Sequence, residues 1–405
     1  MTEINAARLL DDLRRLAEFG RYQTGVDRVA FSEPDISARR WLAGRMGEAG
    51  LEAGLDRYGT VFGRSPEASR SILIGSHTDT VPKGGWLDGA LGVIYGLEIA
   101  RSLRAEGLHG VDVVSFQDEE GTFHPCLGAK AFCGMLDPDV EAAAQDARGN
   151  RLTEAMGATD LDQKAGVFRL DPGRHLAFFE AHIEQGPRLE SAGIAVAVAN
   201  GIVGIRRFQV SAKGQADHAG TTPMGMRRDA GAGLIAAAHA LLGAFRAAAA
   251  AETVWNIGAI AFRPGAPNVV PAEAEMTVEF RDIDAARLDQ FEAALHATLA
   301  ATVALGVAFA VTNLGRVESI SFDRDLGQAI HDAARKRGFT ALDFASGAGH
   351  DAMVLGRQIP AALMFIPSIG GRSHDITENT RPEDIIAGCQ VMADAVKARL
   401  REFSG

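Results

Sequence analysis

The 405-residue sequence has few cysteines and no excess of basic residues. Its three cysteines are odd in number and form no CxxC pair, which argues against a disulfide framework and against a structural zinc knot. Such a composition is typical of a protein of the reducing cytoplasm. The formal net charge is -11, whereas nucleic acids and anionic membranes bind clustered Lys and Arg. We therefore expect neither as a partner and favour a small molecule.

Long hydrophobic runs are also missing from the N-terminal region. Residues 1–20 mix acids and bases in a helical pattern, whereas a secretory signal or a membrane span requires an uninterrupted apolar segment. These residues predict a first helix. The Ala-rich stretch 247–251 continues a helical pattern and predicts the end of a helix rather than a linker. The chain is 47% apolar and, at this length, is expected to form two domains.

Short apolar runs predict the strands of an α/β domain. SILIGS over 71–76 and VDVVSF over 111–116 suit buried strands, and a third run, LAFFEA, leads into His182. In open α/β sheets the functional groups gather beyond the carboxyl ends of the strands. His77 follows the first run and residues 117–121 follow the second, so we expect a catalytic domain with a mixed sheet flanked by helices and a site at this edge.

Residues 204–315 show a different order of elements. The pattern predicts strand, helix, strand, strand, helix and strand, which is the split βαβ arrangement of a small self-sufficient domain. We expect this β-α-β-β-α-β domain to be inserted between two parts of the larger one, as a lid. The predicted boundaries are 1–205 and 319–405 for the two parts of the catalytic domain and 206–318 for the lid.

Five residues with metal-ligand chemistry lie in short Gly-containing segments: His77, Asp88, Glu120, His182 and His374. Neutral imidazoles and carboxylates are the ligands that borderline divalent ions such as zinc accept. The two oxygens of Asp88 could bridge two ions. Together these residues predict a two-metal hydrolase site, with zinc as the first expectation and manganese, cobalt or nickel as alternatives.

Two further carboxylates stand beside these ligands. We expect Asp79 to hold the His77 imidazole from behind. Glu119 and Glu120 are adjacent after a buried strand, where two carboxylates repel each other and lose solvation unless a cation is present. Because adjacent side chains point in different directions, Glu120 can bind a metal while Glu119 faces water as a general base.

Each of these residues also has a structural interpretation. The His77–Asp79 pair could cap a loop, and Asp118 to Glu120 could complement the dipole of a helix N-terminus. His182 or His374 alone could be a hydrogen-bonded core histidine. The candidates gain weight only through a pattern that links them.

That pattern resembles the dinuclear-metal amidohydrolases that include N-carbamoyl-L-amino acid hydrolase, allantoate amidohydrolase, ureidoglycolate amidohydrolase and β-ureidopropionase. The similarity runs almost end to end. The motifs that carry it occur in the family's order: GSHTDTV, GGWLDGALGV, QDEEGTF, HIEQGP, DHAGTTPM, PNVVP, EFRD, SGAGHDA and SHD.

The resemblance implies two divalent metal ions per subunit, one held by His77, Asp88 and His182 and the other by Asp88, Glu120 and His374. Asp88 bridges them in this arrangement, and Glu119 is the base. The resemblance also implies a homodimer formed through the inserted domain.

In that dimer, His218 of DHAGTTPM reaches the active site of the partner subunit and stabilises the oxyanion. A turn cap beside Gly220 and Thr221 is its structural alternative. Arg281 resembles a substrate-carboxylate binder, and the planar fork of an arginine suits a carboxylate. Its structural alternative is a salt bridge to Asp282 or Asp284. The other residues that resemble substrate binders are Asn268, Gln185, Gly349 and His350.

The expected reaction is hydrolysis of a linear amide or ureido bond, with an N-carbamoyl-L-amino acid as the first expected substrate. Allantoate, ureidoglycolate and 3-ureidopropionate are alternatives within the family. An N-acyl amino acid deacylase or a dinuclear aminopeptidase shares the metal arrangement. A non-catalytic, metal-dependent binder of small acids is the alternative from another class, and Glu119 argues against it because a binder needs no base.

One stretch departs from the family pattern. Many relatives have Arg-Phe after the paired glutamates, whereas this sequence has Thr122 and Phe123, followed by His124 and Pro125. His124 could line the substrate pocket or lie exposed in a loop, and the exposed position is slightly favoured. The substrate side chain is therefore left open.

Overall fold

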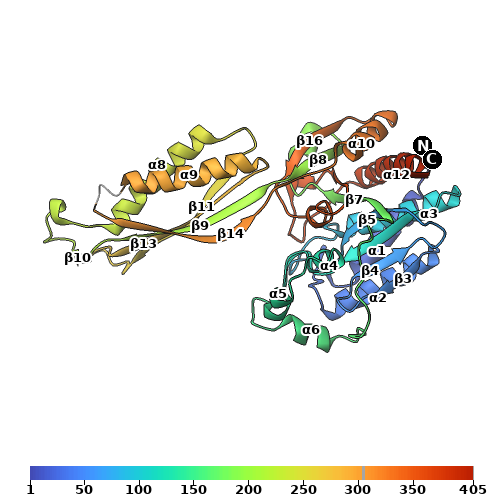
Figure 1. Cartoon of the computed structure of the whole chain (residues 1–405), viewed down its shortest axis with the longest axis horizontal. Helices are drawn as coiled ribbons and strands as arrows, with labels where there is room; N and C mark the ends of the chain where they lie inside the picture. Colours follow the sequence, from blue (N-terminus) through green and yellow to red (C-terminus); the bar gives the residue numbers. More distant parts are fainter. Residues whose placement is uncertain (303–305, 405) are drawn as a thin grey trace. The chain divides into compact units, whose positions relative to one another are not determined.

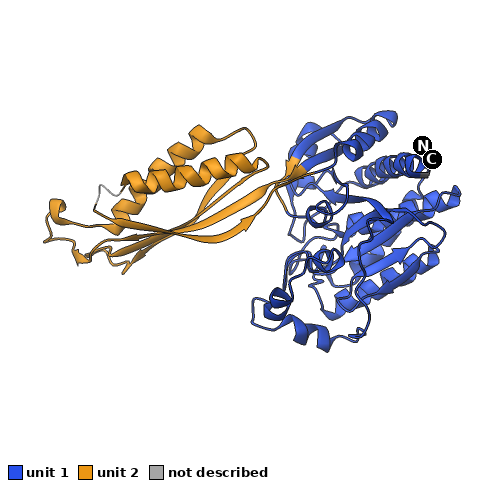
Figure 2. Ribbon diagram, viewed as in Figure 1, with its two compact units in different colours: residues 1–200, 322–344, 349–405 blue, residues 201–321, 345–348 orange. Residues whose placement is uncertain are grey.

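The computed structural model describes residues 1–302 and 306–404. The chain divides into two compact units, shown in different colours in Figure 2. Unit 1 comprises residues 1–200, 322–344 and 349–405, and unit 2 comprises residues 201–321 and 345–348. The second unit thus interrupts the first.

Unit 1 is built on a mixed sheet (Figure 1). Its central strands β17, β7, β5 and β6 are parallel. At one side β4 pairs antiparallel with β6 and β3 pairs antiparallel with β4, and at the other side β8 pairs antiparallel with β17. The predicted α/β class is confirmed. The strands are β3 (Glu52–Leu55), β4 (Val61–Arg64), β5 (Ser71–His77), β6 (Val111–Phe116), β7 (His175–Ile183), β8 (Val196–Ile202), β16 (Ala341–Ser346) and β17 (Ala361–Ile366), with a separate hairpin of β1 (Arg21–Tyr22) and β2 (Gly25–Val26).

Helices cover this sheet and share one large apolar core with it. Helix α3 packs on β5, β6 and β7 and is buried over most of its length, which explains its nearly continuous apolar sequence. Helix α1 starts where Asn5 accepts a hydrogen bond from the Arg8 amide, and α2 starts at Ser32 in the same way, with Pro34 in its first turn. The helices of unit 1 are α1 (Ala6–Glu18), α2 (Glu33–Glu48), α3 (Ala90–Ala105), α4 (Leu127–Phe132), α5 (Pro138–Ala143), α6 (Leu152–Ala158), α7 (Arg188–Ala192), α10 (Arg324–Lys336), α11 (Ala352–Leu355) and α12 (Pro382–Ser404), with the short 3-10 helix η3 (Ile369–Gly371).

Unit 2 has the predicted order β-α-β-β-α-β. Four long strands form an antiparallel sheet in the order β11-β13-β9-β14, and α8 and α9 pack on it around a separate apolar core. Buried and partly exposed residues alternate along β13, as the pleat of a sheet covered on one face requires. The elements are β9 (Gly204–Lys213), β10 (Asp217–His218), η1 (Met224–Met226), α8 (Ala230–Ala248), β11 (Val254–Arg263), β12 (Val269–Val270), β13 (Glu273–Asp282), α9 (Ala285–Thr302), β14 (Ala308–Val317) and β15 (Ile320–Ser321).

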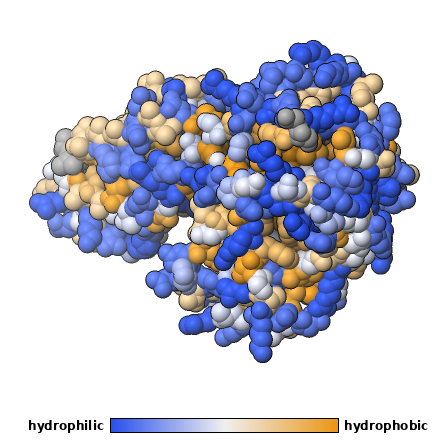
Figure 3. All heavy atoms as spheres, turned by 45° about the vertical axis from the view of Figure 1, so that its right-hand side comes forward, coloured by the Kyte–Doolittle hydropathy of each residue, from blue (hydrophilic) through white to orange (hydrophobic). Residues whose placement is uncertain are grey.

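Within the described residues, α8 is the one helix that is long and apolar enough to cross a membrane. Its buried residues, among them Leu234, Leu241 and Phe245, belong to the core of unit 2. Phe245 stacks on Phe291 of α9 with ring centroids 4.5 Å apart. The apolar sequence of α8 is therefore explained by packing inside this unit. On the face shown in Figure 3, hydrophilic residues are spread between smaller apolar areas.

Candidate functional site

The predicted ligands of unit 1 lie where parallel strands end. In the register of β5 and β6, His77 lies opposite Phe116, so the loops that follow both strands begin at the same edge of the sheet. His182 is the last residue but one of β7. Gly89 has a φ of 65°, and a Cβ there would lie 2.4 Å from the His77 ring. A side chain at this position would displace the imidazole.

Two overlapping groups of potential ligands share Asp88. In the first group, Asp88 Oδ1 lies 2.9 Å from His182 Nε2 and 3.5 Å from His77 Nε2. In the second group, His374 Nε2 lies 3.4 Å from Asp88 Oδ2 and 3.5 Å from Glu120 Oε2. The structure thus brings together all five residues that the sequence predicted, and each oxygen of Asp88 faces a different group.

The electrostatics of the cluster suit cations. Burial raises the pKa of Glu119 well above its usual range and that of Glu120 to about 7. Glu120 Oε1 is buried without a hydrogen-bond partner. Burying carboxylates in this way is unfavourable unless a positive charge compensates them. Imidazole and carboxylate donors in two groups that share a bridging residue are a donor set that fits two divalent ions.

The histidines of the cluster and Asp88 shift each other's pKa. Burial opposes the ionisation of Asp88, but the neighbouring imidazoles outweigh it and hold the pKa of Asp88 well below its usual range. The hydrogen bond to Asp88 raises the pKa of His374 to about 9, although this side chain is half exposed. A metal ion bound to one of these imidazoles would replace the second proton of the ring, because a metal-bound imidazole must be neutral.

Asp79 is buried behind His77, but its contact differs in detail from the expected one. His77 Nδ1 lies 3.0 Å from the Asp79 backbone carbonyl, whereas the Asp79 carboxylate is 3.8 Å away. The carboxylate instead accepts a hydrogen bond from the Glu120 amide (3.3 Å) and one from Arg39 (3.2 Å). Asp79 therefore connects two ligand-bearing segments, and Arg39, which holds it, was not among the predicted site residues.

Glu119 lies directly beside the ligands. Its Oε2 is 3.5 Å from His77 Nε2, and the Cys126 thiol is 3.8 Å from its Oε1. The alternative in which residues 118–120 begin a helix is wrong, because the next helix starts only at Leu127. Asp118 has a φ of 55°, and its carboxylate accepts the amides of residues 122–124, which closes a tight loop after Glu119 and Glu120.

Gln185 and two residues that the sequence analysis missed surround Asp88. Gln185 Nε2 donates to Asp88 Oδ2 (2.9 Å), and the Ser373 hydroxyl donates to the same oxygen (3.0 Å). Glu378 is buried and accepts the amides of Leu87 and Asp88, both at 3.0 Å. Its position four residues after His374 was the available signal, but its target lies about 290 residues away in the sequence.

His350 also lies at the cluster. Its ring is buried and packs edge-on against His182, with centroids 4.4 Å apart, and burial lowers the pKa of His350 well below its usual value. Gly349, next to it, is exposed. Glu180 on β7 accepts the amide of Ala352 (2.7 Å) and thereby holds this segment. The SGAGHDA motif thus brings a neutral imidazole to the ligands.

His218 and Asn268 lie together in unit 2. His218 is exposed, and its Nδ1 accepts the amides of Gly220 (3.0 Å) and Thr221 (3.2 Å). The turn-cap alternative is therefore present in the structure. Because Nδ1 is an acceptor here, the proton of the neutral ring is on Nε2. Asn268 is exposed, and its backbone carbonyl accepts a hydrogen bond from the backbone amide of Ala219.

Arg281 makes contacts other than those expected as its structural alternative. Its guanidinium binds Glu279 (2.7 Å) and the carbonyl of Gly347 (2.8 Å) rather than Asp282 or Asp284. Residues 279 and 281 lie on the same face of β13, while Asp282 points to the other face. The structural alternative of a salt bridge to Asp282 or Asp284 is therefore wrong. Part of the Arg281 guanidinium is already bound by groups of unit 2.

His124 is half-buried rather than exposed, so the favoured expectation was wrong. Its Nε2 lies 2.9 Å from Lys130 Nζ on α4, and burial together with this charge lowers the pKa of His124. The preceding residue, Phe123, packs edge-on against Phe31, with centroids 5.6 Å apart. The stretch after the paired glutamates is therefore anchored on both sides.

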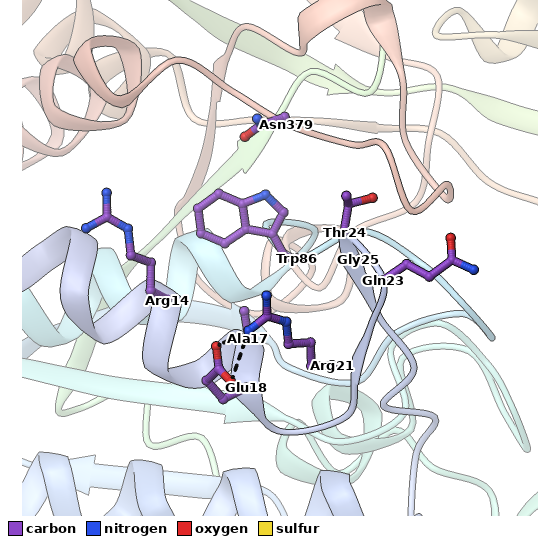
Figure 4. Close-up of a pocket in the computed structure, with 9 residues that line it drawn as sticks. All are labelled: Arg14, Ala17, Glu18, Arg21, Gln23, Thr24, Gly25, Trp86 and Asn379. Atoms are coloured by element: carbon purple, nitrogen blue, oxygen red, sulfur yellow. Dashed lines mark hydrogen bonds and ion pairs between the residues drawn. The ribbon is translucent and has the colours of Figure 1, made fainter.

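A surface cavity of about 450 Å³ lies in unit 1 (Figure 4). Figure 4 shows the Trp86 indole among polar side chains of α1 and the β1–β2 hairpin, where Arg21 pairs with Glu18. None of the residues that line this cavity is a predicted site residue. The candidate site is thus located by its donor groups, not by this hollow.

The fold and the ligand groups are compatible with a metal-dependent hydrolase, and comparison with known proteins shows that the enzyme acts on carbon–nitrogen bonds. The model of peptidase family M20/M25/M40 matches residues 73–398, and the chain belongs to this family. The family is metal-dependent, and the structure holds candidate ligand groups for it.

Individual relatives are similar over nearly their whole length. The chain is 34% identical to an N-carbamoyl-L-amino acid amidohydrolase of Geobacillus stearothermophilus, covering 97% of this chain and 98% of that protein. It is 32% identical to an allantoate amidohydrolase of Escherichia coli K12, covering 93% and 94%. A crystal structure of an amidase of the hydantoinase/carbamoylase family from Burkholderia phymatum is 43% identical, with a TM-score of 0.93 and 99% of both chains covered. The predicted family and type of enzyme are confirmed.

Proposed function

We propose that this protein hydrolyses the carbamoyl C–N bond of N-carbamoyl-L-amino acids with two divalent ions, zinc in the first place. One observation carries the proposal: two ligand groups share Asp88, and Glu119 stands beside them without belonging to either group. A carboxylate in that position serves a reaction, because binding alone needs no base. The relatives that act on N-carbamoyl-L-amino acids support the choice of substrate.

The site residues have different proposed roles as metal ligands and as a base. His77, Asp88 and His182 would hold one ion and Asp88, Glu120 and His374 the other. When bound, such ions make water acidic and polarise a carbonyl. Glu119 takes a proton from the attacking water. After the water oxygen has bonded to the carbonyl carbon, Glu119 gives the proton to the nitrogen as the C–N bond breaks.

For a carbamoyl group this leaves ammonia, carbon dioxide and the free amino acid. Glu119 can serve both steps because its carboxylate lies beside the ligand groups, with Oε2 3.5 Å from His77 Nε2, and a carboxylate can accept a proton and return it. Gln185, Gly349 and His350 are the proposed pocket residues of unit 1.

Unit 2 supplies the other proposed groups. Arg281 and Asn268 would bind the substrate carboxylate, and His218 would donate from Nε2 to the oxyanion in the active site of a partner subunit. The proposed homodimer forms through this unit. In support, large apolar side chains are exposed on the two outer strands of its sheet, β11 and β14: Val254, Ile260, Phe262, Leu314 and Val317. A cytoplasmic location is proposed from the three free cysteines.

The test is an activity screen of the metal-free protein reconstituted with zinc, manganese, cobalt or nickel. Carbamoyl, formyl, acetyl and dipeptide derivatives of one amino acid are compared with allantoate, ureidoglycolate and 3-ureidopropionate. We expect the highest kcat/KM for a carbamoyl amino acid, with ammonia released. Preference for acetyl or dipeptide substrates would replace the proposal by deacylase or aminopeptidase activity. Binding of ureido acids without turnover would replace it by a binding function.

A further inference from the structure

Arg39 on α2 is fully buried, which is unusual for an arginine and requires compensating contacts. Its Nε donates to Asp35 (2.7 Å) and its Nη2 donates to Asp79 (3.2 Å). Its Nη1 donates to the carbonyls of Ser115 and Phe116, the last two residues of β6, at 3.3 and 3.0 Å. One side chain therefore ties α2 to the end of β6 and to the loop after β5.

The two carboxylates that share this guanidinium lead to the candidate metal centre. Asp79 accepts the Glu120 amide with its carboxylate and contacts His77 Nδ1 with its carbonyl, so it touches one ligand from each group. Asp35 accepts the side-chain amide of Gln117 at 2.8 Å, which holds the loop that leads to Glu119 and Glu120. The contacts of the arginine thus reach the ligand segments after both β5 and β6.

We propose that Arg39 is a positioning residue for the metal centre, which acts through Asp79 and Asp35 without touching an ion. Without the guanidinium, Asp79 loses the hydrogen bond from Arg39 and two buried carboxylates lose their compensating charge, so the Asp79 side chain is free to turn away. Such a turn alters the hydrogen bond between Asp79 and the Glu120 amide. The inference rests on the proposed function, because it requires the cluster to bind metal.

A role in folding alone is the competing explanation, and Arg174 offers a matched control. Arg174 is also buried and binds a buried carboxylate of the same sheet, Asp112, at 2.8 and 2.9 Å. It also donates to the carbonyl of Ser65. Asp112 is the second residue of β6, whereas Arg39 binds the last two. The two arginines therefore make similar contacts at opposite ends of one strand.

The experiment compares the full-length wild type with Arg39→Met, Arg39→Lys and Arg174→Met. Zinc affinity is measured by competition with a chromogenic chelator, ligand geometry by the visible absorption spectrum of the cobalt-loaded protein, and stability by denaturant unfolding. We expect Arg39→Met to weaken zinc binding about 10- to 100-fold, as loss of a residue that orients ligands does, and to change the cobalt spectrum. Arg39→Lys should show a smaller loss because it keeps the charge. Arg174→Met should lose stability but keep both metal properties.

Wild-type zinc affinity and cobalt spectrum in Arg39→Met would overturn the inference, and so would an equal loss of affinity in Arg174→Met. If Arg39→Met does not fold, Arg39→Lys decides, since unchanged metal properties in that variant also overturn it. A wild type that binds no zinc and hydrolyses nothing contradicts the proposed function instead, so the two failures can be distinguished.

Discussion

Removing the metal ions should make the stability of this protein depend on Glu120. Burial raises the pKa of this carboxyl from 4.5 to about 7. Because the folded state then holds the proton more tightly than the unfolded state, stability is highest at low pH and is lost as the pH rises from 4.5 through 7. A shift of this size corresponds to about 3 kcal/mol at 1.36 kcal/mol per pKa unit. About 1 kcal/mol of that loss falls between pH 6 and pH 8.

Other groups titrate in the same range, so the comparison needs a matched variant. His374, with its pKa raised to about 9, adds a loss of stability above its unfolded pKa of 6.5, whereas the lowered pKa of His350 gives an opposite trend below pH 6.5. Glu120→Gln removes the carboxyl titration and keeps a side chain of similar size. The quantity to measure is the free energy of unfolding of wild type minus that of Glu120→Gln, by denaturant titration after chelation.

This difference should fall by about 1 kcal/mol from pH 6 to pH 8 in the metal-free protein. With zinc bound, the carboxylate is compensated and the fall should disappear, while the wild type gains stability by mass action. A difference that is independent of pH without metal, or equally steep with zinc, would refute the reasoning that burial and a missing cation raise this pKa.

Three further predictions follow from the site and the packing. Glu119→Gln should keep its bound metal, measured by elemental analysis, but lower kcat at least about 100-fold, and full turnover would contradict the role of this residue as a base. Arg281→Lys should raise KM about 10-fold with a smaller change in kcat, because one ammonium cannot replace a planar fork, and an unchanged KM would exclude substrate contact. Phe291→Ala, in the core of unit 2, should cost about 3–5 kcal/mol in calorimetric unfolding of that unit while metal content stays unchanged.

Much of the fold could be predicted from local patterns. The β-branched runs at 71–76 and 111–116 became β5 and β6, and the β-α-β-β-α-β order of unit 2 followed from alternating periodicities. Period two along β13 also places Glu279 beside Arg281, so this ion pair was available from the sequence but was not used. The tight loop closed by Asp118 was less accessible, because it depends on a positive φ at a non-glycine residue.

The sequence by itself determined the chemistry of the site: imidazoles, a potential bridging carboxylate and a neighbouring base, carried in glycine-containing segments at strand ends. Only the tertiary structure decided how these groups are held. Glu378 reaches Asp88, and Arg39 reaches Asp79, across long stretches of chain. Hydrogen bonds between residues so far apart depend on where the folded sheet and its helices place them, and no local pattern encodes that distance.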